Sequence, residues 1–325
     1  MAKRLFAVFC LLLLSPLIAE YLLGSLPVSM LPILPVMVLM YGSGAVLIRE
    51  IVRQTGKGWP SLILLATAYG FIEEGLVTQS LFNPNYMHMR LLDFGFIPAL
   101  GTSLVWAIYV LALHMFWSIA TPVGLTESLF PKRRDTPWLG KIGLGVVAVL
   151  YVLGSLLVAA FTYKSLPFMA SPPQLIAVAA IVVALIVAAF AWPKPQAAGT
   201  AKVPHPLALF LMSFILGSLF VGSEFFGKRV LHLGPAAAVA ILIGCELITL
   251  LAMIALTRGR QWSNGQRYAL MLGAFAVYVW LGFPTDLALH GRGDLPGHTV
   301  LTVVMIAIAV IAGFRAGTSK VAVEG

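Results

Sequence analysis

The sequence predicts an all-α integral membrane protein: a polytopic bundle of about ten transmembrane helices with both termini in the cytoplasm. The first observation is composition, because 60% hydrophobic and 10% charged residues, with a mean hydropathy of +0.97, lie far outside the range of soluble domains. The second is a series of apolar runs, each long enough to cross about 30 Å of hydrocarbon. These runs lie at about 5–25, 29–48, 61–82, 98–121, 139–162, 173–192, 206–223, 235–256, 267–284 and 298–314.

The third observation is the distribution of positive charge, because Lys and Arg collect in cytoplasmic loops. With the N-terminus inside, all but five of the 21 basic residues fall in cytoplasmic segments; the outer ones are Arg90, Lys164, Lys228, Arg229 and Arg292. The net charge of +9 is spread over short loops rather than gathered in a patch, which argues against a nucleic-acid partner. We therefore expect an integral protein of the bacterial cytoplasmic (inner) membrane, with the lipid bilayer as a partner.

The first run, 5–25, follows Lys3 and Arg4 and so also resembles a secretory signal peptide. The stretch before Glu20 lacks a small-x-small cleavage site, and more apolar residues follow Pro16, so we expect a retained helix. Cleavage is the alternative, and it would leave the topology of the remaining chain unchanged. The second run, 29–48, carries no ionisable acid or base and returns the chain to the cytoplasm.

The third run, 61–82, carries two adjacent acids, Glu73 and Glu74. Each acid at a helix centre costs roughly 2.5 to 3.5 kcal/mol, and such residues in membranes usually mark functional sites. Helical spacing places Thr78 on the same stripe as Glu74. Two carboxyls this close in a low dielectric should not both be ionised, and such a pair suits general acid and base chemistry, a proton relay or a cation site. The alternative is a structural pair, with both acids neutral and hydrogen-bonded to neighbouring helices.

The fourth run, 98–121, contains His114, the one histidine that we expect inside the membrane, with Ser118 on the same face. A lone buried histidine is more often a packing residue, but the glutamates of the preceding helix favour a shared site. For these bounds, His114 lies nearer the cytoplasm than Glu74. A kink or a later helix start would bring the two side chains level.

The fifth and sixth runs, 139–162 and 173–192, have apolar cores and are expected to be lipid-facing or packing elements. The Pro- and Ala-rich stretch 192–206 is typical of a cytoplasmic linker. We therefore treat 1–325 as a single integral membrane domain, with two halves, 1–192 and 206–325, joined by this linker.

The last four runs add one more intramembrane acid, Glu246, in the middle of the eighth. If the halves form an inverted repeat, the third and eighth helices correspond and Glu246 joins the Glu73 and Glu74 site at the midplane. In the ninth run, Pro284 is expected to break the helix, so that Asp286 lies near the outer surface. Glu20, at the outer end of the first run, is expected at a similar depth.

The remaining candidate ligands give no metal signature. Four histidines are expected in outer loops: His88, His232, His290 and His298. Their spacing matches no HExxH-type zinc motif. The two cysteines, Cys10 and Cys245, lie in apolar runs, which excludes a CxxC site. We predict no metal and no cofactor, and segment 83–95 is either a lid over the glutamates or an ordinary interfacial loop.

The segment GFIEEGLVTQ resembles the first motif of the CAAX-processing and bacteriocin-processing (CPBP) glutamic intramembrane proteases. In that family paired glutamates open an E-E-x-x-x-Arg motif, and a histidine from a following F-x-x-x-His helix supports the oxyanion. The resemblance covers about residues 61–121 and implies that Glu73, Glu74 and His114 are the matching residues. Thr78 stands in place of the arginine and Val110 in place of the phenylalanine, and no His-x-x-x-Asn motif follows in 139–192. Other parts of the chain look like bacterial membrane proteins of unassigned function.

Three functions stay open at this point. The first is a membrane-embedded hydrolase in which Glu73 or Glu74 activates water, His114 is the electrophilic partner, and Thr78 and Ser118 give polar support. The second is a proton- or cation-coupled transporter that uses Glu73, Glu74 and Glu246. The third is a scaffold without chemistry. The sequence leaves the question of enzyme activity uncertain and does not identify the oligomeric state or the substrate, which we expect to be membrane-borne or a small molecule.

Overall fold

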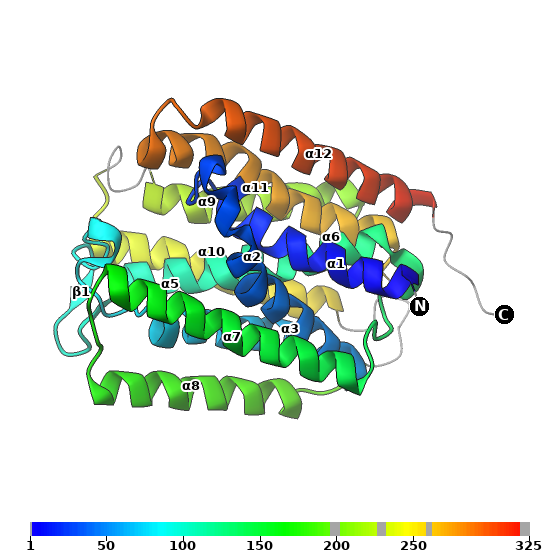
Figure 1. Cartoon of the computed structure of the whole chain (residues 1–325). Helices are drawn as coiled ribbons and strands as arrows, with labels where there is room; N and C mark the ends of the chain where they lie inside the picture. The colour runs from blue at the N-terminus through cyan, green and yellow to red at the C-terminus, as the bar shows by residue number, and fades with distance from the viewer. Residues whose placement is uncertain (1, 196–201, 226–231, 258–261, 319–325) are drawn as a thin grey trace.

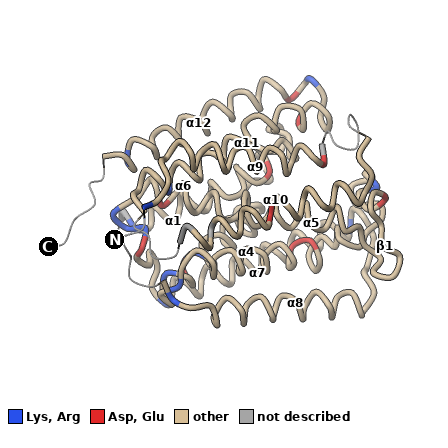
Figure 2. The backbone as a smooth tube through the Cα atoms, turned by 180° about the vertical axis from the view of Figure 1, so that it is seen from behind, with Lys and Arg blue, Asp and Glu red and all other residues tan. Residues whose placement is uncertain are grey.

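Ten helices of the computed structural model are long and apolar enough to cross a membrane, counting the described residues 2–195, 202–225, 232–257 and 262–318. They pack side by side as a single all-α bundle, which confirms the predicted fold class (Figure 1). Helix α1 begins and α12 ends at the same end of the bundle, as an even number of crossings requires. Lys and Arg are concentrated at that end (Figure 2), which the positive-inside rule assigns to the cytoplasm.

The first four crossings are each built from several helical pieces. They are α1 (Ala2–Pro16) with η1 (Leu17–Leu22); η2 (Val28–Ile33) with α2 (Leu34–Met37), η3 (Val38–Gly42) and α3 (Ser43–Gln54); α4 (Trp59–Phe71) with η4 (Ile72–Val77); and α5 (Leu104–Ala112) with η6 (Leu113–Ala120) and α6 (Thr121–Leu129). The other six are the single helices α7 (Lys141–Ser165), α8 (Pro172–Ala191), α9 (Pro206–Phe225), α10 (Pro235–Thr257), α11 (Asn264–His290) and α12 (Leu295–Thr318). Loops hold η5 (Tyr86–His88), β1 (Phe96–Ile97), β2 (Thr102–Ser103) and η7 (Pro131–Arg133).

Burial divides the helices into an inner and an outer group. In the α4–η4 crossing 67% of the most apolar window is buried, whereas the share is 17% for each of α7, α8, α9 and α10. Large apolar side chains such as Leu156 and Ile176 point away from the protein on α7 and α8. This pattern agrees with the lipid-facing role expected for the fifth and sixth helices.

Each of the first four crossings contains a π-helical segment: η1, η3, η4 and η6. A π-helical turn holds an extra residue, widens the helix and is frequent at functional sites. These four segments carry Glu20, Tyr41, the Glu73–Glu74 pair and His114, respectively. The helical distortions therefore coincide with the polar residues of the inner helices.

Two helix ends differ from the sequence expectation, and both differences shape the site. The third crossing ends at Val77 instead of residue 82, because Gln79 adopts a left-handed φ of 57° and turns the chain back toward Glu74. The fourth begins at Leu104 instead of residue 98, because β1 and β2 form a short antiparallel hairpin and Ser103 caps the helix. The fourth crossing then continues to Leu129. This late start is the shift that His114 needed to reach the level of Glu74.

The expectation for the ninth and tenth crossings was wrong at their outer ends. Pro284 does not break the ninth helix, because α11 continues through it to His290. Asp286 and His298, expected in outer loops, are both fully buried within α11 and α12. His114 is therefore not the sole histidine within a spanning helix. The turn between the helices needs few residues because Gly291 adopts a φ of 73°.

A buried ion-pair network at the cytoplasmic end fixes α3 against α6. Arg49 is fully buried and contacts Glu50 on its own helix and Glu127 on α6, at 2.5 and 3.1 Å. Arg53 adds a 2.8 Å ion pair to Glu127. The Arg49 guanidinium also stacks 3.5 Å from the ring of Trp138. These residues tie the second crossing, the fourth crossing and the loop after it into one rigid unit.

Candidate functional site

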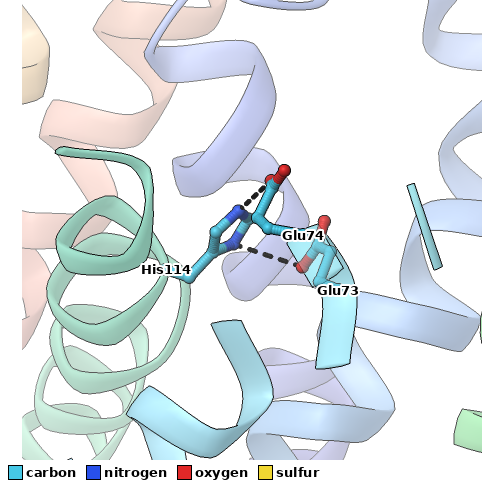
Figure 3. A group of neighbouring side chains, drawn as sticks. All are labelled: Glu73, Glu74 and His114. Atoms are coloured by element: carbon cyan, nitrogen blue, oxygen red, sulfur yellow. Dashed lines mark hydrogen bonds and ion pairs between the residues drawn. The ribbon is translucent and has the colours of Figure 1, made fainter. Parts of the chain in front are cut away.

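The imidazole of His114 lies between the carboxylates of Glu73 and Glu74 (Figure 3). Its Nε2 is 2.6 Å from Glu74 Oε1, and its Nδ1 is 3.2 Å from Glu73 Oε2. All three residues are buried, with 2%, 7% and 5% of Glu73, Glu74 and His114 exposed. The structure thus brings together the three residues that the sequence singled out for hydrolysis.

Glycine at position 70 allows the two helices of the site to approach. A Cβ atom at Gly70 would lie 3.2 Å from the Cβ of His114 and 3.3 Å from a methyl group of Leu111. The close contact between α4 and η6 therefore depends on the missing side chain. One turn later the wide turn of η4 presents both glutamates to the same imidazole.

Glu74 is held on both carboxylate oxygens. Oε1 contacts His114, while Oε2 accepts hydrogen bonds from the hydroxyls of Thr78, at 3.2 Å, and Ser80. The Trp106 indole in turn donates to the Ser80 hydroxyl over 3.2 Å. The turn after Val77 therefore holds the Glu74 carboxylate in place. The sequence predicted a helix to residue 82 and so did not predict this turn.

Glu73 has fewer partners. Its Oε2 is buried and makes no hydrogen bond within the described part of the chain; its close charged neighbour there is His114 Nδ1. The same nitrogen lies 3.2 Å from the hydroxyl of Ser118, so Ser118 belongs to the cluster, as does Thr78. Of the two carboxylates, Glu74 is therefore the one that neighbouring hydroxyls hold in place.

Two tyrosines complete the surroundings of the imidazole. The rings of Tyr41 and Tyr69 each lie 6.0 Å from that of His114, between centroids. The Tyr41 hydroxyl donates a 2.5 Å hydrogen bond to Glu20, which links a third carboxylate to the cluster. Tyr41 was not among the residues expected at the site; the one signal for it in the sequence is a hydroxyl-bearing aromatic residue in an apolar segment.

The outer loop 83–95 contains one half-buried tyrosine, Tyr86 on η5. Burial, followed by the negative charges of Glu74 and Glu20, raises the pKa of the Tyr86 phenol well above its usual range. Most of the other residues of the loop are exposed or half-buried. The two alternatives for this segment, a lid over the glutamates and an ordinary interfacial loop, both stay predictions.

Glu73, Glu74 and His114 are also residue types that bind metal ions. One ligand atom from each of Glu73, Glu74 and His114 lies within 4.8 Å of the others. Zinc binds such ligands at about 2.0 to 2.2 Å, so two tetrahedral donors stand roughly 3.3 Å apart. The 2.6 Å contact between His114 Nε2 and Glu74 Oε1 is shorter and fits a shared proton. A metal ion would first have to separate these two side chains.

The structure places Glu246 elsewhere. Glu246 is one of the residues that line a cavity between α4, η6, α9, α10 and α11, together with Phe116 and Trp117. Neither Glu73, Glu74 nor His114 lines that cavity. The segment η6 thus presents His114 and Ser118 to the cluster and its aromatic residues to the cavity.

Comparisons with known proteins address the whole chain. The model of a family described as an uncharacterized membrane protein family matches residues 9–323. The searches of curated proteins and of solved structures found no match.

Proposed function

Because the chain belongs to an uncharacterized membrane protein family, we propose its function from the site itself: a membrane-embedded hydrolase that acts on a membrane-borne peptide or lipid-linked substrate. The observation that carries this proposal is the position of His114, whose two ring nitrogens face Glu73 and Glu74 at 3.2 and 2.6 Å. Two carboxyls joined by an imidazole can store, accept and return a proton within one site.

The contacts support different roles for the two glutamates. Glu73, the less restrained carboxylate, takes a proton from a water molecule whose oxygen attacks the substrate carbonyl. Glu74, held by Thr78 and Ser80, keeps the His114 ring oriented. When Glu73 has taken that proton, the N–H at His114 Nδ1 is released from the Glu73 carboxylate and donates a hydrogen bond to the oxyanion that develops. The bond to the leaving group then breaks, and Glu73 returns its proton to that group, so the number of protons is conserved.

The resemblance to CPBP-type glutamic proteases agrees with this assignment at residues 61–121. The paired acids and the histidine of the following helix come from the positions that the resemblance implies. Thr78, which stands where that family has arginine, donates a hydrogen bond to Glu74. A buried hydroxyl therefore contacts the second glutamate from the position at which that family has arginine.

The coupled transporter remains the alternative function. The residues that it needs lie in two separate places, whereas those of the hydrolase are in contact. The transporter function requires Glu246 to share an ion or a proton with Glu73 and Glu74. Glu246 lines a different cavity, whereas His114 contacts both glutamates. The hydrolase is therefore the function that the contacts favour.

Hydrolysis can be tested without knowing the substrate. The full-length protein in lipid nanodiscs is incubated in H₂¹⁸O with detergent-solubilised peptides and lipids from its host membrane. Mass spectrometry then detects products with ¹⁸O in a new carboxyl group. We expect ¹⁸O-labelled products with the wild type and none with Glu73→Gln, which keeps the side-chain shape and removes the base. Equal labelling by both proteins, or by neither, would contradict the proposal.

A further inference from the structure

One arginine at the cytoplasmic end of the bundle has no negatively charged partner within the described part of the chain. Arg267, in the first turn of α11, forms no ion pair there, and its buried Nε atom has no hydrogen-bond partner. The carboxylates of Glu50 and Glu127 are already paired with Arg49 and Arg53 on α3. The charge of Arg267 is therefore left without an anion.

Arg267 shares a small pocket with a second arginine. Arg134, in the loop after α6, lines the same pocket, together with Trp59 and Asn264. Glu127 is the one acid among the described lining residues, and the arginines of α3 donate hydrogen bonds to both of its oxygens. Two guanidinium groups therefore line a pocket that offers them no free carboxylate.

Arg134 is only partly neutralised and can be reached by a ligand. Its Nε pairs with Asp135 at 2.8 Å, but the Asp135 side chain is 63% exposed, so water weakens this ion pair. The Arg134 side chain is 21% exposed, which leaves it accessible from outside the protein. Asn264 is the first residue of the long helix α11, so the positive end of the helix dipole also lies at this pocket.

The size of the pocket limits the ligand. Its volume of about 20 Å³ holds a group of the size of one water molecule. One oxygen of a phosphate group fits, while the rest of the ligand stays outside the pocket. Guanidinium groups bind phosphate oxygens through charge-assisted hydrogen bonds. Phospholipid headgroups supply phosphate at this end of the bundle, and basic pockets between membrane helices on the cytoplasmic side bind such headgroups.

We propose that Arg267 and Arg134 bind a phosphate group, supplied by an anionic phospholipid of the cytoplasmic leaflet. Free inorganic phosphate offers the same chemistry, and the test distinguishes the two sources. The proposal is independent of the hydrolase, because neither Glu73, Glu74 nor His114 lines this pocket.

The test measures lipid binding to the full-length protein in detergent, after removal of bound lipid, by native mass spectrometry. The ligand is dioctanoyl phosphatidylglycerol, and dioctanoylglycerol, which has the same chains and no phosphate, measures the apolar part of the affinity. Inorganic phosphate is added as a competitor. We expect phosphatidylglycerol to bind about tenfold more tightly than dioctanoylglycerol, and inorganic phosphate to compete weakly.

Four variants locate the site. Arg267→Gln and Arg134→Gln should each remove most of the preference for phosphatidylglycerol, and Arg267→Lys, which keeps a charge without the planar fork, should remove less of it. Arg90→Gln is the matched control, because it removes an exposed arginine from the outer end, and it should bind like the wild type. Thermal unfolding without lipid should show Arg267→Gln to be at least as stable as the wild type, since the lost charge has no partner among the described residues.

Two results would overturn the proposal. One is equal binding of phosphatidylglycerol and dioctanoylglycerol by the wild type. The other is a preference for phosphatidylglycerol that Arg267→Gln and Arg134→Gln retain, or that Arg90→Gln loses to the same extent. If inorganic phosphate binds as tightly as the lipid and is lost in Arg267→Gln, the phosphate site is correct and the lipid is wrong as its source.

Discussion

His114 on η6 and Glu74 on η4 share a buried contact of 2.6 Å between two adjacent membrane helices, although forty residues separate them in the sequence. A contact this short between a ring nitrogen and a carboxylate is typical of a charge-assisted hydrogen bond. It fixes the orientation of the imidazole, and the opposite nitrogen then faces Glu73. The chemistry that we propose depends on this orientation.

The first prediction concerns Glu74 itself. Glu74→Gln preserves the shape of the side chain and its hydrogen bonds to Thr78 and Ser80, so the variant should insert and fold normally. The variant has a neutral amide in place of the carboxylate next to His114, so we expect function to be lost. Expression, thermal unfolding and complementation of a host that requires the protein provide the measurements. Full complementation at normal expression would remove Glu74 from the mechanism.

Gly70 provides a test of helix spacing. In Gly70→Ala the new methyl group would lie 3.2 Å from the His114 Cβ, so η6 must shift by a few tenths of an ångström. We expect hydrolysis to fall by about tenfold, because small displacements of catalytic groups are costly. Gly145→Ala on α7 is the control, since a Cβ there meets nothing within 4 Å. Equal activity of the two variants would show that the α4–η6 distance is not critical.

The ion-pair network at the cytoplasmic end should dominate local stability. Arg49→Met leaves Glu50 buried without its ion-pair partner, and such a loss typically costs about 3 to 5 kcal/mol in the free energy of unfolding. Arg90→Met removes the exposed pair with Asp93 and should leave the free energy of unfolding close to that of the wild type. Denaturant unfolding in detergent compares the two. Similar losses for both variants would contradict the structural role of Arg49.

The topology can be tested in intact cells with a membrane-impermeant thiol reagent. Cysteines placed at the exposed positions Arg90 and Arg292 should be labelled, whereas one at Asp135 should not. The background should lack Cys10 and Cys245, the two native thiols. Labelling at position 135 from outside would contradict the topology of ten helices with both termini in the cytoplasm.

Much of the fold could be predicted from the sequence because hydropathy and charge act along the chain. All ten crossings were found in this way, and the cost of two acids in hydrocarbon singled out Glu73 and Glu74. Hydropathy did not predict the shared level of His114, although Pro98, Gly101 and the N-cap residue Ser103 are turn and helix-start signals that indicate a later start of the fourth helix.

Other features depend on packing between helices that are distant in the sequence. Arg49 was counted only as a cytoplasmic charge, although it is fully buried against Glu50 and Glu127. Glu246 was assigned to the site by the position of its helix in the chain. Its true neighbours depend on the rotation and the contacts of α10, and no periodic pattern in a single sequence gives these.

The most direct test of the central claim compares His114→Ala with Glu246→Gln in the ¹⁸O assay, at equal expression and with equal thermal stability. Loss of one oxyanion donor typically lowers the rate by about 10²- to 10³-fold, so His114→Ala should be nearly inactive. Glu246→Gln should hydrolyse at close to the wild-type rate, because Glu246 lines a cavity that neither Glu73, Glu74 nor His114 lines. A severe defect in Glu246→Gln beside a near-normal His114→Ala would contradict the hydrolase and favour the coupled transporter.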